Sequence, residues 1–352
     1  MKNKKIFYYF IFFAFISIIT LYSASSILPD HLDNIYLKQL IIYIICLFIL
    51  IFFKNNKFIF EKINLLYIIG VISLIGLLLF AKPINNAKCW YIIPFLGTFQ
   101  PSEFIKILIV IYIAIILVNK TNHKFFKVFL ILIIPSILTY LQPDTGLVII
   151  YLISVFSMFF CYIKKFKLFI YTGISFSVLL GIIVFMYYQN QEILINIFGD
   201  SIFLRVERLI NWHNQNGYQL NNALTAIGST GFNFNFRNIN LYYPEAHTDF
   251  IFASFASSFG IFLSLILIII IILFDLYLLN LSLKTKNERD KLIIIGFTSI
   301  LIYQQIQNIG MNLGLLPITG ITLPFISYGG SSLLSYTLML AIIRNMNQKR
   351  KV

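Results

Sequence analysis

The sequence predicts an all-α integral membrane protein with about ten transmembrane helices in one bundle. Of the 352 residues, 59% are hydrophobic and 11% are charged, which is far more apolar than a soluble globular domain. Apolar runs long enough to span a bilayer recur along the whole chain. Because the loops between most of these runs are short, we treat residues 1–352 as a single domain.

The apolar runs define the predicted helices in order. They comprise residues 6–22, 37–53, 65–81, 104–118, 125–141, 146–163, 166–188, 250–279, 292–313 and 323–343. The first run follows a basic start and precedes Ser23-Ala24-Ser25, as a signal peptide would. We favour a retained helix, because the run is long for a signal-peptide core and its loss would leave an odd number of spans.

The net charge of +14 would suit a nucleic-acid-binding protein, so the placement of the cations decides what it means. If the N-terminus is cytoplasmic, 20 of the 27 Lys and Arg residues fall on the inner side. They lie in segments 2–5, 54–62, 120–127, 164–167, 284–291 and 344–351. This distribution follows the positive-inside rule. It predicts two cytoplasmic termini and no nucleic-acid partner.

Two longer loops are then extracytoplasmic, at about residues 82–101 and 189–249, the second between the seventh and eighth helices. The second loop contains amphipathic pieces at 203–212 and 219–227, which we expect to lie along the membrane surface. Nine of the thirteen acidic residues fall outside or at the outer membrane edge. The functional site is therefore expected to lie on the outer side of the membrane.

The segment Pro244-Glu245-Ala246-His247-Thr248-Asp249-Phe250 ends the larger loop where it meets an apolar helix. A charged group at such an edge is costly to hold and is typical of a functional site. Asp249 fits a general base whose proton affinity is raised by burial and by Glu245, with His247 tuning it. The alternative is that Asp249 only caps the helix that follows.

Three further charged residues lie near two helix starts. Glu103 and Lys106 are three residues apart and can pair on one helix face, either as a structural ion pair or as a substrate contact. Asp144 opens the next outward-to-inward helix, where capping is the favoured role. Both helices begin with similar sequences, Gln100-Pro101-Ser102-Glu103 and Gln142-Pro143-Asp144-Thr145, and proline suits a first helical turn.

Each of the remaining polar candidates has two possible roles, one in binding a ligand and one in structure. Lys88, Trp90, Arg205 and Arg208 could bind phosphate or pyrophosphate, or anchor the outer membrane interface. Several amides could bind sugar hydroxyls or bridge helices; they are Gln142, Gln219, Gln304, Gln305, Gln307, Asn308 and Asn312. The run containing Ser331 favours close helix packing over ligand binding. The three cysteines are far apart and indicate neither a disulfide framework nor a metal site.

Taken together, the motifs resemble the SEDS family of bacterial cell-wall proteins, which includes RodA and FtsW. The resemblance covers nearly the whole chain in family order. It rests on Trp90, Phe99 to Lys106, Leu141 to Gly146, Gly217 to Gln219, Ala226 to Ser229, Pro244 to Phe252, Asn308 to Met311 and Leu315 to Ser332. The chain departs from the family pattern at Cys89, where a cation is usual, and at Ser257-Ser258, where an acidic pair is usual.

The resemblance implies a ten-helix glycosyltransferase that polymerises lipid II on the outer face of the bacterial cytoplasmic membrane. Asp249 matches the family's essential aspartate. The implied substrate-binding set comprises Lys88, Trp90, Gln100, Glu103, Lys106, Gln142, Asp144, Arg205, Arg208, Gln219, Glu245, His247 and Ser331. The leaving undecaprenyl pyrophosphate needs compensation by cations or by a divalent metal such as Mg²⁺ or Mn²⁺, whose ligands the sequence does not identify.

The implied partners are the lipid-linked glycan, a class B penicillin-binding protein that crosslinks the strands, and other membrane proteins of the elongation or division machinery. Met311 and Pro317-Ile318-Thr319-Gly320 favour a RodA-like role in cell elongation over an FtsW-like role in division. Two alternatives stay open. A lipid II flippase or transporter would also hold intramembrane charges, and a non-catalytic scaffold would not need Asp249.

Overall fold

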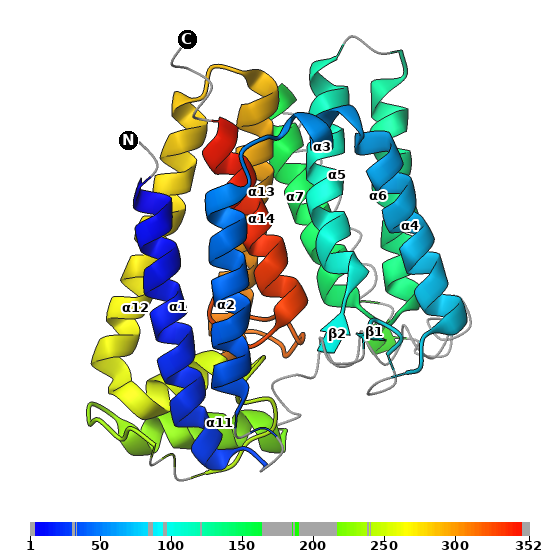
Figure 1. Cartoon of the computed structure of the whole chain (residues 1–352). Coiled ribbons are helices and arrows are strands. Elements are labelled where there is room, and N and C mark those ends of the chain that lie inside the picture. The colour runs from blue at the N-terminus through cyan, green and yellow to red at the C-terminus, as the bar shows by residue number, and fades with distance from the viewer. Residues whose placement is uncertain are drawn as a thin grey trace.

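The computed structural model describes residues 4–29, 32, 34–83, 87–93, 97–119, 122–163, 185, 187–189, 217–237, 239 and 241–346. The chain forms a bundle of long helices, and both chain ends lie at the same end of it (Figure 1). Among the described residues, eight helices are long and apolar enough to cross a membrane. This confirms the predicted class. The predicted helix 166–188 lies almost wholly outside the described residues, and the piece 203–212 entirely so.

The helix bounds follow the apolar runs closely. The helices are α1 (Lys4–Ala24), α2 (Ile35–Phe52), α3 (Lys57–Glu61), α4 (Ile63–Phe80), α5 (Pro101–Val118), α6 (Lys124–Leu141), α7 (Thr145–Ile163), α11 (Tyr218–Thr230), α12 (Ile251–Lys284), α13 (Glu288–Asn312) and α14 (Gly330–Met346). Pro101 is the first residue of α5, as its missing N–H favours. The start of α7 lies beside Asp144, whose Oδ1 accepts the Leu147 N–H at 3.1 Å, so the predicted cap is confirmed.

The predicted last helix, 323–343, begins too early, because α14 starts only at Gly330. Phe325 has a φ of +66°, which a regular right-handed helix does not allow. The preceding backbone bonds to a distant loop instead. Ser327 Oγ donates to the Thr248 carbonyl at 2.7 Å, and the Tyr328 N–H donates to the His247 carbonyl at 2.9 Å. Tertiary hydrogen bonds thus override the apolar pattern of this segment.

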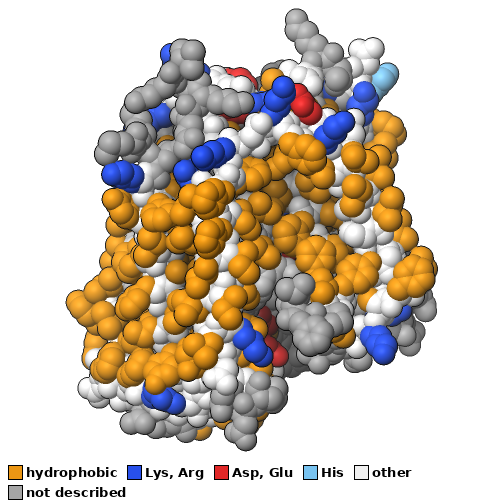
Figure 2. All heavy atoms as spheres, in the orientation of Figure 1, with side chains coloured by type: hydrophobic (Ala, Val, Ile, Leu, Met, Phe, Trp, Pro, Cys, Tyr) orange, Lys and Arg blue, Asp and Glu red, His pale blue; other side chains and the backbone are white. Residues whose placement is uncertain are grey.

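Helices α5, α13 and α14 lie at the centre of the bundle and others form its rim. In both α5 and α13, 72% of the residues in the most apolar 18-residue stretch are buried, against 28% in α2 and 22% in α4. The large apolar side chains exposed on the rim helices include Ile41, Phe48, Ile72 and Leu79. Figure 2 shows these kinds of side chains as a continuous apolar band around the visible face. Such a band is the surface that lipid chains would cover.

The end of the bundle away from the termini carries the irregular structure. There α11 lies across the helix ends (Figure 1), and its bounds confirm a helix at the predicted 219–227 piece. A short antiparallel hairpin pairs β1 (Tyr91–Ile93) with β2 (Gly97–Phe99), a departure from an all-helical chain that the sequence did not predict.

The long helix α12 is interrupted at Gly260, which has a φ of 77° and a ψ of 171°. A Cβ at this position would lie 2.6 Å from the Asn233 carbonyl oxygen. The Ile261 N–H donates to the Gly231 carbonyl at 2.9 Å. The loop after α11 therefore supplies the hydrogen bond that the interruption removes, and only glycine fits there.

Candidate active site

The loop 244–250 folds into a compact turn directly before α12. Glu245 has a φ of 57°, and its carbonyl accepts N–H groups from Thr248 at 3.1 Å and Phe250 at 3.0 Å. The Thr248 hydroxyl donates to Glu245 Oε2 at 2.6 Å. These bonds fix the order of side chains around the turn, so the Glu245 carboxylate is held by its own loop.

Asp249 is held by its backbone rather than by its side chain. Its carbonyl accepts two side-chain amide N–H groups from α13, one from Asn308 and one from Asn312, each at 2.8 Å. The residue that precedes α12 is Phe250, and no side chain of the loop caps that helix. The capping alternative for Asp249 is therefore wrong.

The Asp249 carboxylate is half-buried and lies against the loop that precedes α14. A Cβ added to Gly320, whose φ is +68°, would meet Asp249 Oδ2 at 3.5 Å. In the described part of the chain, no hydrogen bond or ion pair occupies either oxygen of this carboxylate. The group is thus positioned by its neighbours yet available to a ligand.

The electrostatics of the site follow from burial and from neighbouring acids. Burial, Glu245 and Asp144 raise the pKa of Asp249 from 3.8 to about 7. Burial likewise raises the pKa of Asp144 to about 6, with Glu103 adding to the rise while the Leu147 N–H, Gln100 and Lys106 oppose it. A carboxyl with a pKa near neutrality is suited to accept a proton at physiological pH.

Asp144 belongs to a hydrogen-bond network that joins several helix starts. Gln100 Nε2 donates to Asp144 Oδ2 at 2.8 Å. The Gln100 N–H in turn donates to Ser331 Oγ at 3.0 Å, and Ser331 Oγ donates to the Thr98 carbonyl at 3.2 Å. The hairpin, the start of α5, the start of α7 and the start of α14 therefore meet in one polar network.

Glu103 and Lys106 form the predicted ion pair inside the bundle. Lys106 Nζ donates to Glu103 Oε2, and Ser335 Oγ donates to the same oxygen at 3.0 Å. The ammonium also lies 4.3 Å from the centre of the Tyr336 ring. Lys106 is fully buried and Glu103 is 6% exposed. Both charges are compensated within the protein, which favours the structural reading of the pair.

The other predicted residues that the structure describes make contacts of their own. Gln142 is buried and donates from Nε2 to the Leu74 carbonyl at 3.0 Å, so it bridges helices. Lys88 is half-buried, with Nζ donating to the Leu78 carbonyl at 3.2 Å. Trp90 and Gln219 are half-buried, and the His247 ring lies 5.8 Å from that of Tyr328. Arg205 and Arg208 lie outside the described residues.

The two departures from the family pattern occupy satisfied positions. Cys89 is buried and donates from Sγ to the Gln142 carbonyl at 2.9 Å. The Ser258 hydroxyl lies 2.8 Å from that of Ser23, and the Ser257 hydroxyl lies 3.4 Å from that of Tyr243. Neutral side chains thus fill both places with local hydrogen bonds.

The acids do not form a metal site of their own. Among the residues that the structure describes, no group of three or more His, Cys, Asp or Glu side chains is arranged to hold a metal ion. The described side chains therefore do not supply a complete set of metal ligands by themselves. A divalent cation here would need most of its ligands from a substrate's phosphate groups and from water.

Some acidic side chains are visible from the outside of the molecule (Figure 2). Figure 2 shows acidic side-chain atoms inside a hollow of the apolar face, toward the end away from the chain termini. The starts of α5, α7, α12 and α14 all lie at that end (Figure 1). The hollow therefore opens beside the lipid-facing surface of the bundle.

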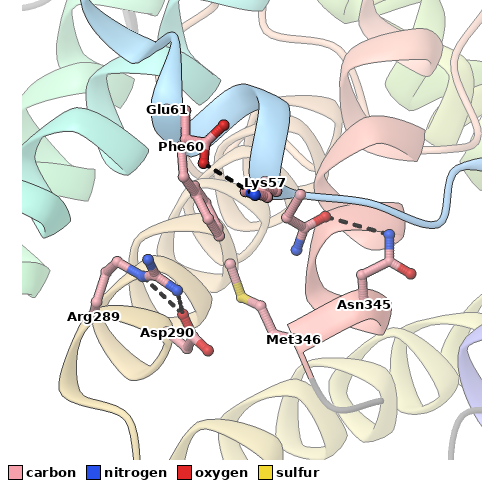
Figure 3. A pocket seen from close by; sticks show the side chains of 8 residues that line it. Lys57, Phe60, Glu61, Arg289, Asp290, Asn345 and Met346 are labelled. Carbon is pink, nitrogen blue, oxygen red and sulfur yellow. Dashed lines mark hydrogen bonds and ion pairs between the residues drawn. The ribbon is translucent and has the colours of Figure 1, made fainter. Parts of the chain in front are cut away.

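A pocket of about 270 Å³ at the opposite end has a different character. Its charged side chains pair with one another, Lys57 with Glu61 at 3.5 Å and Arg289 with Asp290 at 2.8 Å (Figure 3). The Arg289 guanidinium also covers the Phe60 ring at 4.2 Å. These charges are neutralised locally, so this pocket lacks the unpaired acid that distinguishes the Asp249 site.

Sequence comparisons identify the relatives of the chain. The family model described as cell cycle protein, for FtsW, RodA and SpoVE, matches residues 3–352. The chain is 32% identical to a probable peptidoglycan glycosyltransferase FtsW of Bacillus subtilis over 295 residues, covering 80% of this chain and 72% of that protein. It is 31% identical to the protein of the same name from Buchnera aphidicola (Schizaphis graminum) over 336 residues, covering 89% and 90%.

Solved structures match the fold over nearly all of the chain. One, described as the structural coordination of polymerization and crosslinking by a peptidoglycan synthase complex, has a TM-score of 0.83 at 22% identity, covering 99% of this chain and 98% of the other. Rod shape determining protein RodA of Thermus thermophilus has a TM-score of 0.68 at 22% identity, covering 97% of each chain. The chain belongs to the FtsW, RodA and SpoVE family, the SEDS proteins.

Proposed function

We propose that this chain is a peptidoglycan glycosyltransferase that polymerises lipid II into glycan strands. The observation that carries the proposal is the Asp249 carboxyl, which is positioned through its backbone, has no hydrogen-bond or ion-pair partner among the described residues, and has a pKa raised to about 7. The relatives named peptidoglycan glycosyltransferase support the reaction class. A general base with this pKa suits the activation of a sugar hydroxyl.

In the proposed reaction, Asp249 accepts the proton of the C4 hydroxyl of an N-acetylglucosamine on the acceptor lipid II. The hydroxyl oxygen attacks C1 of the N-acetylmuramic acid on a lipid-linked donor strand. The new C1–O4 bond forms as the bond from C1 to the pyrophosphate oxygen breaks, and undecaprenyl pyrophosphate leaves with the electron pair. Burial, together with the neighbouring Glu245 and Asp144, raises the pKa of Asp249, which makes it a stronger base.

The other residues would bind and orient the substrates. Gln100 and Ser331 lie in the polar network with Asp144 and offer hydrogen bonds to sugar hydroxyls. The departing pyrophosphate needs cations, for which we propose Lys88, Arg205 and Arg208. Lys106 forms an ion pair with Glu103, so we propose a structural role for it, in which it stabilises the packing of the helix starts. Trp90, Gln219 and His247 stay candidate contacts to the sugars or the peptide, whereas we assign Gln142 to bridging helices.

We further propose that the site faces outward from the bacterial cytoplasmic membrane. The basic clusters predicted to be cytoplasmic include Lys57 and Arg289, which line the pocket at the end opposite Asp249. The positive-inside rule then places Asp249 on the extracytoplasmic side. The hollow beside the apolar band would let a polyprenyl tail stay in the bilayer while its sugars reach the acids.

The partner and the cellular role are proposals of the same kind. A structural neighbour is a peptidoglycan synthase complex that coordinates polymerization with crosslinking, which supports a class B penicillin-binding protein as the partner. We assign the chain to cell elongation on the RodA-like sequence around Met311 and Pro317 to Gly320. Complementation of an elongation-deficient strain, but not of a division-deficient one, would support this role, and the reverse would overturn it.

The reaction is tested with the purified chain in liposomes that contain lipid II, with and without its cognate penicillin-binding protein. Wild-type protein should make glycan strands, and Asp249→Asn should make none above background. Strand synthesis at the wild-type rate by Asp249→Asn would refute the assignment. Movement of lipid II across the bilayer without polymer would favour the flippase alternative.

A further inference from the structure

The start of α12 is capped by a residue from another helix. Ala253 is the third residue of α12, and its N–H belongs to the group that has no partner within the helix. An N-terminal cap side chain would usually accept such a bond. Here Asn312 Oδ1, at the end of α13, accepts the Ala253 N–H at 2.9 Å. The helix therefore has its cap without using Asp249.

The same amide also holds the backbone of Asp249. Asn312 Nδ2 donates to the Asp249 carbonyl at 2.8 Å, so one side chain bridges the residue before α12 and the first turn of the helix. Its oxygen faces a donor and its nitrogen faces an acceptor, which fixes the orientation of the amide. Asn312 is fully buried, and its contacts exclude competing water.

Asn308, one helical turn earlier, completes the arrangement. Its Nδ2 donates to the Asp249 carbonyl and to the Ile321 carbonyl, both at 2.8 Å. Ile321 follows Gly320, the residue that lies against Asp249 Oδ2. Asn308 therefore ties the segment that contacts the carboxylate to the backbone that carries it, and it too is fully buried.

We infer that Asn308 and Asn312 are positioning residues for Asp249, and that Asn312 takes over the helix cap so that the Asp249 carboxylate stays available to the acceptor sugar. This inference rests on the proposed function, because it assumes that Asp249 is the base. Neither amide needs to touch the substrate. Asn312 accepts the Ala253 N–H, which would otherwise attract the Asp249 carboxylate. Asn308 fixes the position of the 317–323 segment relative to Asp249.

The charged groups around Asp249 define what a change should do. Glu245 on its own loop and Asp144 at the start of α7 face it, with the Glu103 and Lys106 pair adjoining Asp144. The helix α13 contributes amides, and the 317–329 segment contributes Tyr328 beside His247. If the Ala253 N–H loses its acceptor, the Asp249 carboxylate can turn toward it, and a hydrogen bond to the charged form lowers a carboxyl pKa.

The test compares two substitutions of one residue in glycan-strand assays over a range of pH, at saturating and at limiting lipid II. Asn312→Ala should lower kcat by roughly 10- to 100-fold, as expected for a displaced catalytic group, and should shift the acid limb of the pH profile to lower pH. Asn312→Asp keeps an acceptor for the Ala253 N–H but places a second acid beside Asp249. It should shift the acid limb to higher pH. KM should change little in either variant.

Asn308→Ala leaves the helix cap in place, so it should lower kcat without moving the acid limb. It carries the test alone if Asn312→Ala is not recovered as folded protein. The matched control is Asn345→Ala. Asn345 is a buried asparagine at the opposite end whose Nδ2 donates to the Phe53 carbonyl at 2.8 Å, and its loss should leave kcat and the pH profile unchanged.

The outcomes separate this inference from the proposed function. If Asp249→Asn is inactive while Asn308→Ala and Asn312→Ala behave like Asn345→Ala, the positioning role is overturned and the base assignment stands. If Asp249→Asn polymerises normally, the base assignment itself fails. Opposite shifts of the acid limb in the two Asn312 variants would support the inference, because a general loss of stability does not predict them.

Discussion

Two buried acids of the same bundle end have opposite surroundings. Glu103 is 6% exposed, is paired with the ammonium of Lys106, and accepts a hydrogen bond from Ser335. Asp249 is half-buried, and its burial together with the neighbouring acids Glu245 and Asp144 raises its pKa to about 7. Burial of a charge costs free energy unless the charge is paired. The paired acid is thus typical of structure, and the unpaired one of chemistry.

The difference lies in how the backbone is used. Asp249 is held through its carbonyl by two amides of α13, whereas Glu103 is held through its carboxylate. A residue that is held by its main chain can keep its side chain available to a ligand. Backbone anchoring therefore distinguishes a positioned reactive group from a structural ion pair that happens to lie nearby.

The largest expected effect is the loss of activity in Asp249→Asn, which contrasts with a loss of stability in Glu103→Gln. Asp249→Asn should lower the polymerisation rate by about 10²- to 10⁴-fold, the usual contribution of a general base. Glu103→Gln should instead lower stability, because it leaves Lys106 buried without its carboxylate. Strand synthesis and thermal denaturation of both variants in detergent check this. Equal losses of both properties in the two variants would remove the distinction.

The same substitution should change the pH dependence of stability. The pKa of Asp249 is raised on folding from 3.8 to about 7, so its contribution to stability is present at low pH and is lost as the pH rises through about 7. Asp249→Asn should therefore be more stable than wild type above about pH 7, with the advantage fading toward pH 4. Denaturation midpoints across this pH range measure it, and a constant difference would contradict it.

The ion pair can be broken from its other side. Lys106→Met removes the cation and leaves Glu103 buried, which should lower the free energy of unfolding by about 3–5 kcal/mol. The double variant Glu103→Gln with Lys106→Met should recover much of that loss, because no uncompensated charge remains. Denaturation of the single and double variants provides the comparison. Full recovery of stability with retained polymerisation would assign the pair to structure alone.

A smaller effect is expected at Gly320. Its φ of +68° disfavours any other residue by about 1–2 kcal/mol. An added Cβ would lie in ordinary van der Waals contact with Asp249 Oδ2, at 3.5 Å, so a backbone shift that relieves the strain would change the surroundings of the carboxylate. Gly320→Ala should therefore lower stability slightly and kcat more clearly. Gly314→Ala is a matched control, since Gly314 has a φ of +70° and a Cβ added there would meet the Leu224 side chain instead of an acid. A similar kcat for both variants would argue against contact with the base.

The smallest effect is expected from Asp144→Asn. Removing this acid takes away one of the charges that raise the pKa of Asp249, so the acid limb of the polymerisation profile should shift to lower pH by less than about one pH unit. An asparagine can still cap α7, so stability should change little. An unchanged or upward-shifted limb would show that Asp144 does not act on Asp249 through its charge.

Much of the fold was predictable because membrane spans carry a strong local signal. The bounds of α1, α2 and α7 follow the apolar runs within a few residues, since apolar length is itself what a bilayer requires. The late helix was misjudged at Leu323 because the apolar residues before Gly330 serve a loop. That loop is fixed by distant bonds to Thr248 and His247, which no local pattern reveals.

The site was predictable in its residue types and less so in its geometry. Asp249, Glu245 and Asp144 stood out because acids at the edge of apolar helices are costly to hold. Their mutual effect depends on a fold that brings together chain positions more than 100 residues apart. Gly320 belonged to a family motif, but its place beside the acid could not be predicted, because that place depends on a positive φ and on a fold that brings its Cβ position within 3.5 Å of Asp249 Oδ2.

The pH dependence of glycan polymerisation by wild-type protein tests the role of Asp249 most directly. With lipid II saturating, the rate should rise with pH through a single ionisation near the raised pKa of Asp249, about 7, and the residual rate of Asp249→Asn should lack that limb. A wild-type rate that is flat between pH 5 and 8, or the same limb in Asp249→Asn, would contradict proton abstraction by this carboxylate.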